Sequence, residues 1–550
     1  MTKKKHIILW SVLAVVAILI TIAVLYADKI VTSVADAELH KALNKNQYIQ
    51  VDYSDLRVRL VAGSISAKDI TCRIVAKEQP LKDTIAQQIS VEYIDVHGIN
   101  WLNLRKKQLD IHNITLKSPQ AEIILPPKQK NKVAATTDTA DVKKSSISNY
   151  ISSVEVHKVK ISGGTVSLKR LENKFALRTD SVTLKFNDLR YDIAQKEFTY
   201  NDSVYSVALR NFALTGSDGL FAVAIGSANT EDAGKVKVNK LRVNNTCKKE
   251  NLAKAKGKVP VTWVDAEITE LTTSDVNLIR QVVNKSVDIE KVDISGKKVQ
   301  LYRDLQYPPK KPYKMLQEAI VNIPIPVHVG EVRLAMKDLA VGLTRDGSHV
   351  GRLALNDVHL NADNFSNATG NVLKTHIIGN LSGSKADMHL NLKNDKACTF
   401  TYTFEANNLR GSALDDFLHP ISGATVSADI HSVNIQTKGD KDINVGTFCM
   451  LYDSLHVHIT KEDAPIERLA KNAGIINFFA PAIIHKSNPR SPNGQPYVAT
   501  VNNRRNPQKN FMAYVMSPFM DGIMHTVLPE GIYQSIKIKM TADNPPAKKQ

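Results

Sequence analysis

The chain has 550 residues, of which 43% are hydrophobic and 6% aromatic, and its formal net charge at pH 7 is +18. This hydrophobic fraction excludes a chain that is disordered throughout, and the length suits several domains or one repetitive body. The positive charge can serve nucleic acid, an anionic membrane surface or solubility, but no cluster of aromatic and arginine side chains supports nucleic acid.

The first predicted element is a membrane anchor at residues 7–26, a run of twenty residues without a charged side chain. A helix of this length spans roughly 30 Å, the thickness of a bilayer core. Lysines precede the run, so residues 1–6 are expected to form a cytoplasmic basic tip, with the bulk of the chain exported. A cleaved signal peptide is the alternative, but Leu25 stands where a cleavage site needs a small residue. The residues assigned to the anchor are Ile7, Trp10, Leu13, Ile20 and Tyr26.

Residues 27–125 begin with helical spacing at Ser33–Leu43 and then change to strand-like alternation. A turn is expected at Gly63, and the strands between Val91 and Ile124 are expected to break near Gly98 and at Ser118-Pro119. Residues 126–148 contain almost no large apolar side chain, which predicts a disordered insert or linker. A short helix is expected near Ser148–Ser153.

A short unit recurs in the main body, residues 149–500. It places one or two glycines ahead of alternating apolar residues, at 161–168, 294–301, 327–334 and 421–428. We interpret each glycine as a turn before a strand, and the uneven spacing as a loose repeat.

Alternation is clearest in three later strands. Residues 398–406 place Cys398, Phe400, Tyr402, Phe404 and Ala406 on one side and mostly threonine on the other. The segment around Met388, Leu390 and Leu392 and the segment around Leu455, Val457 and Ile459 follow the same pattern. Each strand is therefore predicted to have one apolar and one polar side.

Helical spacing is rare in the rest of the chain. It occurs at Val276–Val283, Tyr313–Val321, Ile466–Phe479 and as a C-terminal pair around Ser517-Pro518, within residues 501–550. Ser517 is expected to cap the last helix, in which Phe519, Ile523 and Val527 share a stripe. That helix either covers the end of the sheet, contacts a membrane or plugs a groove.

No catalytic or phosphate-binding motif is present, so no enzyme, cofactor or metal is predicted. A hydrolase with a dispersed active site is the least favoured function. His456 and His458 alternate on one strand face and are interpreted as solvent-facing rather than as a metal site. The four cysteines are interpreted mainly as buried small residues, with a Cys398 to Cys449 disulfide left open.

Three features resemble the AsmA-like family: the stretch from Val91 to Ile123, the unit Ile-Ser-Gly-Gly-Thr-Val-Ser-Leu at 161–168, and Ser-Gly-Ala-Thr-Val-Ser-Ala-Asp-Ile at 422–430. The single N-terminal anchor is a fourth. The resemblance implies an inner-membrane protein of a two-membraned bacterium, with its bulk in the periplasm. It further implies a mainly β fold, in which the transmembrane helix precedes an elongated, twisted antiparallel β-groove with a few short helices.

The function implied by this resemblance is phospholipid transfer or outer-membrane biogenesis. The partners are then phospholipid or another acyl lipid, the inner membrane, and an outer-membrane or periplasmic protein, with no nucleic acid. The rival interpretation is an anchored β-sandwich scaffold or adhesin that binds protein partners. The candidate lipid-facing residues are Val166, Leu168, Val332, Leu334, Met388, Leu390, Leu392, Phe400, Tyr402, Phe404 and Val426.

Overall fold

The computed structural model describes residues 49–59, 62–74, 87–125, 151–170, 172–192, 197–199, 205–231, 234–422, 424–459 and 484–542. The chain is mainly β, with 62% strand and 14% helix. It divides into two compact units, Met1–Val238 and Asn239–Gln550. None of the helices within the described ranges is long and apolar enough to cross a membrane. The predicted anchor at 7–26, the helices at Ser33–Leu43 and Ile466–Phe479 and the insert at 126–148 lie outside the described residues.

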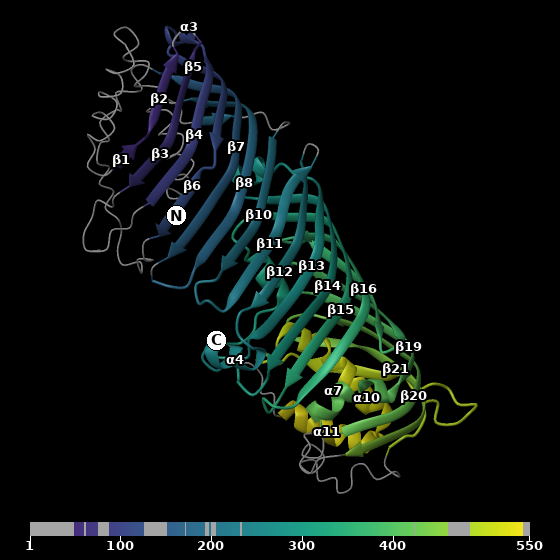
Figure 1. Cartoon of the computed structure of the whole chain (residues 1–550). Helices are drawn as coiled ribbons and strands as arrows, with labels where there is room; N and C mark the ends of the chain where they lie inside the picture. The colour runs from purple at the N-terminus through teal and green to yellow at the C-terminus, as the bar shows by residue number, and fades with distance from the viewer. Residues whose placement is uncertain are drawn as a thin grey trace, which may run out of the picture. The chain divides into compact units, whose positions relative to one another are not determined.

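Unit 1 is built around one mixed sheet (Figure 1). β1 and β2 both pair with β3, which pairs with β4; β4 pairs with β5 and β6, and both of these run parallel to β7. β7 pairs with β8, and β8 pairs with β9 and β10, which continues to β11. The elements are β1 (Ile49–Asp52), β2 (Asp55–Arg59), β3 (Ser64–Ile74), β4 (Gln87–Ile99), α3 (Trp101–Leu104), β5 (Gln108–Lys117), β6 (Gln120–Leu125), β7 (Ser153–Arg170), β8 (Ala176–Asp192), β9 (Glu197–Thr199), β10 (Tyr205–Thr215) and β11 (Phe221–Glu231), while β12 (Lys235–Asn245) crosses the boundary between the units.

Unit 2 pairs its strands in chain order from β13 to β22, and each of these pairs is antiparallel except β14 with β15. Its elements are α4 (Lys249–Ala255), β13 (Thr262–Asp275), α5 (Leu278–Asn284), β14 (Val287–Asp304), α6 (Leu316–Val321), β15 (Val327–Thr344), β16 (Val350–Ser366), β17 (Val372–Leu381), β18 (Ser384–Lys393), β19 (Phe400–Arg410), η3 (Gly411–Leu414), α7 (Asp415–Ser422), β20 (Ala424–Gly439), β21 (Ile443–Ile459), β22 (Ala499–Arg504), α9 (Phe511–Val515), α10 (Ser517–Val527) and α11 (Glu530–Ala542).

The prediction of a purely antiparallel sheet is wrong, because β5, β6 and β14 each have a parallel neighbour. Parallel neighbours need a crossover connection, and the segment that contains α6 supplies one between β14 and β15. A sequence pattern cannot show this, because both kinds of pairing need the same alternation.

Four of the glycines predicted as turns lie inside strands instead. Gly163, with φ +69°, and Gly164 are in β7, Gly296 is in β14 and Gly330 is in β15. At Gly330 a Cβ would lie 2.6 Å from the carbonyl oxygen of Glu290, so the two backbones approach too closely for a side chain. A glycine inside a strand marks a bulge or a close approach, and here that interpretation holds. The turn at Gly63 and the break at Ser118-Pro119 are confirmed.

The helix predictions are confirmed at α5 and α6, but the C-terminal pair is three helices. Ser517 is not the cap: Met516 holds the N-cap position, and Ser517 Oγ donates to the Tyr514 carbonyl at 2.7 Å. At Ser153 the chain is already in β7, so the short helix predicted up to that residue is wrong there. All four cysteines are free, and Cys72 and Cys398 are buried.

Each unit has its own apolar core. In unit 1 the core lies among β1 to β5 and β7. In unit 2 the core joins β17 to β22 with the C-terminal helices. Figure 1 shows α7, α10 and α11 together against these strands, and the contacts of α7 with β16 and β20 and of α10 with β21 and β22 agree.

Candidate functional site

A continuous row of apolar side chains crosses all ten strands of unit 2. Each member stands directly opposite the next one on the neighbouring strand. The row is Leu271, Ile294, Leu334, Leu360, Ile377, Met388, Phe404, Ile435, Phe448 and Ala499. At about 4.8 Å between strands, nine steps cover about 43 Å along the sheet. We call the side of the sheet that carries this row the apolar face.

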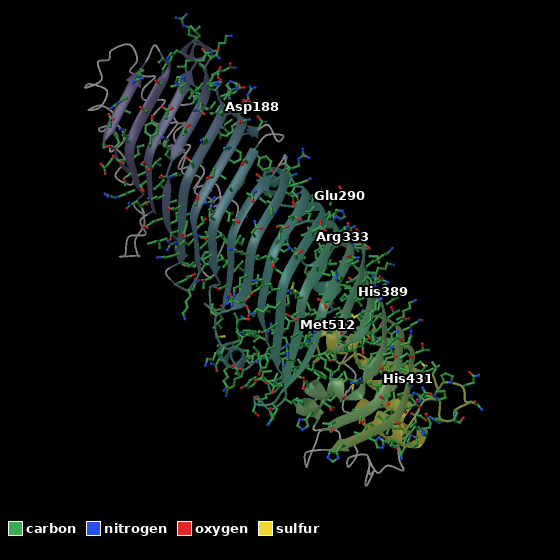
Figure 2. The ribbon with its side chains drawn as sticks, turned by 45° about the vertical axis from the view of Figure 1, so that its right-hand side comes forward. Asp188, Glu290, Arg333, His389, His431 and Met512 are labelled. Atoms are coloured by element: carbon green, nitrogen blue, oxygen red, sulfur yellow. The ribbon has the colours of Figure 1, made fainter. Side chains whose placement is uncertain are left out.

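On each strand, the residue next to the apolar one that continues across the sheet in the same way is polar. These residues form the row Thr272, Asp293, Arg333, Asn361, His376, His389, Thr403, Gln436, Thr447 and Thr500. Arg333 and His389 are labelled in Figure 2. Because successive side chains of a strand point to opposite faces, these residues lie on the opposite, polar face. The predicted separation into an apolar and a polar side is confirmed across unit 2.

The register brings most of the candidate residues of unit 2 together. Leu334, Met388 and Phe404 belong to the apolar row, while Val332, Leu390 and Tyr402 belong to the next row on the same face. Leu392 and Phe400 face each other two residues further along, and Val426 packs against the core from β20. Alternation shows which residues of one strand share a side, but only the register shows which residues of the neighbouring strand continue that side.

The C-terminal helices cover the apolar face over β18 to β22. Phe519 of α10 meets Phe404 at 5.6 Å and Phe448 at 5.5 Å between ring centroids, both nearly perpendicular. Phe400 makes similar edge-on contacts with Phe511 and Tyr514 of α9. Under this cover Leu390, Leu392, Phe400 and Tyr402 are buried.

Polar contacts fasten this helical cover. Asp521 is 4% exposed, and its carboxylate accepts hydrogen bonds from Tyr533 at 3.0 Å and from Lys537 at 2.7 Å. A buried carboxylate is costly unless it is paired in this way. His525 stacks on Tyr533 with ring centroids 3.9 Å apart, and its Nε2 lies 2.9 Å from a Glu530 oxygen. The hydrogen bonds from Gln534 and His525 lower the pKa of Glu530.

Burial of the row members decreases toward the first five strands of the row. Leu271, Ile294, Leu334, Leu360 and Ile377 are all half-buried, and none of them belongs to the core that the described helices share with β17 to β22. By contrast, Ile435, Phe448 and Ala499 at the covered end are each 0% exposed. We call the five half-buried row members from Leu271 to Ile377 the half-buried segment; four strand spacings give it a length of about 20 Å.

Unit 1 has apolar rows of its own. One runs through Val58, Ile65, Val96, Ile114, Val159, Phe186 and Tyr205. The candidate Leu168 stands in a second row, Ile123, Leu168, Leu177, Leu214 and Val223, and Val166 lies two residues before it. Val166 and Leu168 are half-buried, so unit 1 also presents partly accessible apolar side chains.

The polar face of unit 2 carries a group that sequence reasoning missed. His376 of β17 meets Asp387 and His389 of β18, whereas His456 and His458, the pair considered from sequence, remain exposed. The signal that could have found the group is the Ser382-Gly383 turn, because a two-residue hairpin loop sets the pairing on both sides.

Comparisons with known proteins do not assign the chain to a family. No family model matches it, and a search of curated proteins finds no match.

Proposed function

We propose that the apolar face shields lipid acyl chains, and that the protein acts in phospholipid transfer or outer-membrane biogenesis without catalysis. The observation that carries this proposal is the uninterrupted apolar row with its half-buried segment. A contiguous apolar patch that stays accessible to solvent often marks a binding surface. On this proposal residues 7–26 anchor the chain in an inner membrane, and the sheet lies in the periplasm as in the AsmA-like proteins that the sequence resembles.

Such a role requires no chemical reaction, only a lower free-energy barrier for moving the acyl chain. Exposing an acyl chain of about fifteen methylenes to water costs about 12 kcal/mol, at about 0.8 kcal/mol for each methylene. An apolar row that offers contact on every strand removes much of this barrier while the chain moves. Because dispersion and the hydrophobic effect are not directional, the lipid can slide from one strand to the next without breaking specific bonds.

Site-specific photo-crosslinking tests the proposal directly. A photoreactive residue at Leu334 or Leu360 of the full-length chain, expressed in a two-membraned bacterium, should capture phospholipid identifiable by mass spectrometry. The matched controls are Arg333 and Asn361, which are adjacent in sequence but on the polar face. Equal lipid capture at both faces, or capture of protein alone at Leu334 and Leu360, would refute the proposal. Protein alone would favour the scaffold function.

A further inference from the structure

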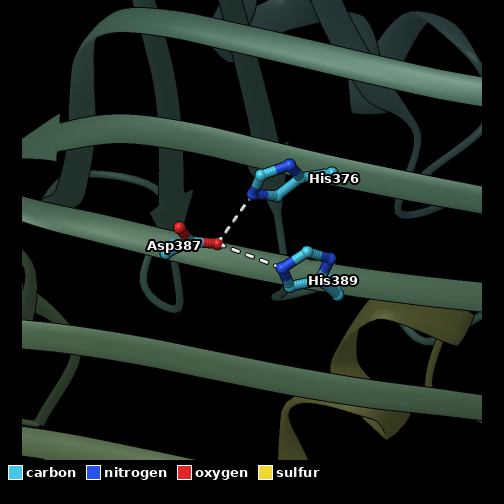
Figure 3. A group of neighbouring side chains, drawn as sticks. All are labelled: His376, Asp387 and His389. Atoms are coloured by element: carbon cyan, nitrogen blue, oxygen red, sulfur yellow. Dashed lines mark hydrogen bonds and ion pairs between the residues drawn. The ribbon is translucent and has the colours of Figure 1, made fainter.

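We propose that His376, Asp387 and His389 form a binding site for a divalent transition-metal ion such as Zn²⁺. Figure 3 shows the two imidazole rings directed at the same carboxylate. His376 Nε2 lies 2.9 Å and His389 Nε2 3.4 Å from Oδ1 of Asp387. One potential ligand atom from each residue lies within 4.8 Å of the other two.

The fold builds this site from one hairpin. His376 and His389 are direct cross-strand partners, and Asp387 lies two residues before His389 on the same face of β18. The connecting residues, Ser382 and Gly383, have φ of 50° and 93°, so both adopt the positive φ that a tight two-residue hairpin turn needs. The three ligands are therefore placed by strands on a fixed register, not by a loop.

The distances suit a small ion. A metal with ligands at about 2.0–2.1 Å in a tetrahedron separates neighbouring ligand atoms by about 3.4 Å. The two nitrogen-to-oxygen distances lie near this value, and the two imidazole nitrogens lie within 4.8 Å of each other. The rings are stacked, with centroids 4.0 Å apart and an 8° angle between planes. An ion between their nitrogens and the carboxylate would take the place of the His376–Asp387 hydrogen bond and of the longer His389–Asp387 contact.

The donor set defines the class of ion. Two imidazoles and one carboxylate favour zinc, nickel, copper or cobalt over calcium and magnesium, which prefer oxygen ligands. Each imidazole must bind through an unprotonated Nε2, which leaves its proton on Nδ1. The side chains of His376, Asp387 and His389 are 34%, 29% and 52% exposed, so an ion can enter from solvent. Three protein ligands leave a fourth tetrahedral position for water or for a donor from another molecule.

Charged neighbours of the site act in both directions. Lys385 Nζ lies 3.9 Å from the other Asp387 oxygen, Oδ2, and its charge disfavours a cation. Glu405 of β19 stands directly opposite Asp387 and accepts a hydrogen bond from Asn434 at 2.8 Å. Its carboxylate favours a cation, so the site combines a negative neighbour with three ligands.

Metal titration of the purified chain tests this inference independently of any lipid. The full-length protein, free of a histidine tag and stripped of metal, is titrated with Co²⁺ as a spectroscopic probe, followed by Zn²⁺ competition. The wild type should bind one ion more than the His376→Gln/His389→Gln variant, with the absorption of a low-symmetry site. The Asp387→Asn variant should bind at least about 10-fold more weakly, which is the lower end of the effect of altering even a residue that only supports a ligand.

Controls separate this site from the remaining histidines, since the chain has 16 in all. His431→Gln is the matched variant, because His431 pairs with Asp453 at 2.9 Å in the same unit but no second imidazole among the described residues is grouped with that pair. It should leave affinity and stoichiometry unchanged, while Lys385→Gln should tighten binding several-fold. Equal metal binding by the wild type and the double histidine variant would overturn the inference, and so would a Lys385→Gln variant that binds more weakly.

Discussion

Replacing Phe519 by alanine is expected to loosen α10 from the apolar face. Its ring packs edge-on against Phe404 at 5.6 Å and Phe448 at 5.5 Å and is half-buried. Phenylalanine-to-alanine changes in cores cost about 3–5 kcal/mol of stability. Because Phe519 is only partly buried, we expect a cost of about 3 kcal/mol for its replacement. That total includes two aromatic contacts of about 0.5–1.5 kcal/mol each.

Native-state hydrogen exchange is the appropriate assay, because a chain with two units need not unfold in one step. The free energy of local opening should fall by about 3 kcal/mol at the amides of α10 and remain unchanged at β13. Met520→Ala is the control, because Met520 is 51% exposed and its loss should cost less than about 0.5 kcal/mol. A double-mutant cycle with Phe404→Ala should give a coupling of about 0.5–1.5 kcal/mol. Equal effects of the Phe519 and Met520 changes would refute the packing argument.

Three further changes probe other parts of the molecule. Leu360→Glu should abolish lipid capture at the half-buried segment while circular dichroism stays unchanged, and undiminished capture would contradict the proposed path. The hydrogen bond that the His157 ring donates to Asp188 is the largest cause that raises the pKa of His157, so this stabilisation is present below pH of about 6.5 and is lost as pH rises through the raised pKa. The free energy of unfolding of His157→Gln should therefore be lower than that of the wild type at pH 5.5 but not at pH 8.5, and the difference should stay below about 1 kcal/mol because the side chain is 39% exposed. Gly446→Ala should lower the thermal midpoint strongly, because the added Cβ would clash with a neighbouring backbone carbonyl. Gly531→Ala should instead raise stability by up to about 1 kcal/mol, because the space around Gly531 is open. Similar shifts for both variants would be inconsistent with the structure.

Local alternation allowed β18, β19 and β21 to be predicted with the correct apolar side, because each of these segments keeps one period over most of its length. The helical stripe of Phe519, Ile523 and Val527 was also predictable, and all three pack against the core. What the stripe packs on was not predictable, because periodicity identifies an apolar side but not its partner. For the same reason the helical cover over Leu390 and Phe400 could not be foreseen.

The metal-binding group required information of another kind. Asp387 and His389 are two residues apart in sequence, but His376 reaches them only through the register of the β17–β18 hairpin. Such a register depends on the exact loop length, and an error of one residue would have placed Ile377 among the polar side chains instead.

The glycine units are best explained by how long strands keep one apolar face. In β14 the residues of the apolar face have even numbers up to Ile294 and odd numbers from Val299 onward. The pairing with β15 passes over Lys297 between them. β15 skips a residue at the same level, and β16 makes the same change at Asp357, whose φ is +48°. Because neighbouring strands shift together, Val299 remains beside apolar partners instead of turning to the polar face. A pattern that looked like a turn followed by a strand is therefore one bent strand, and the aligned bends are what allow an apolar face to continue along strands of up to 18 residues.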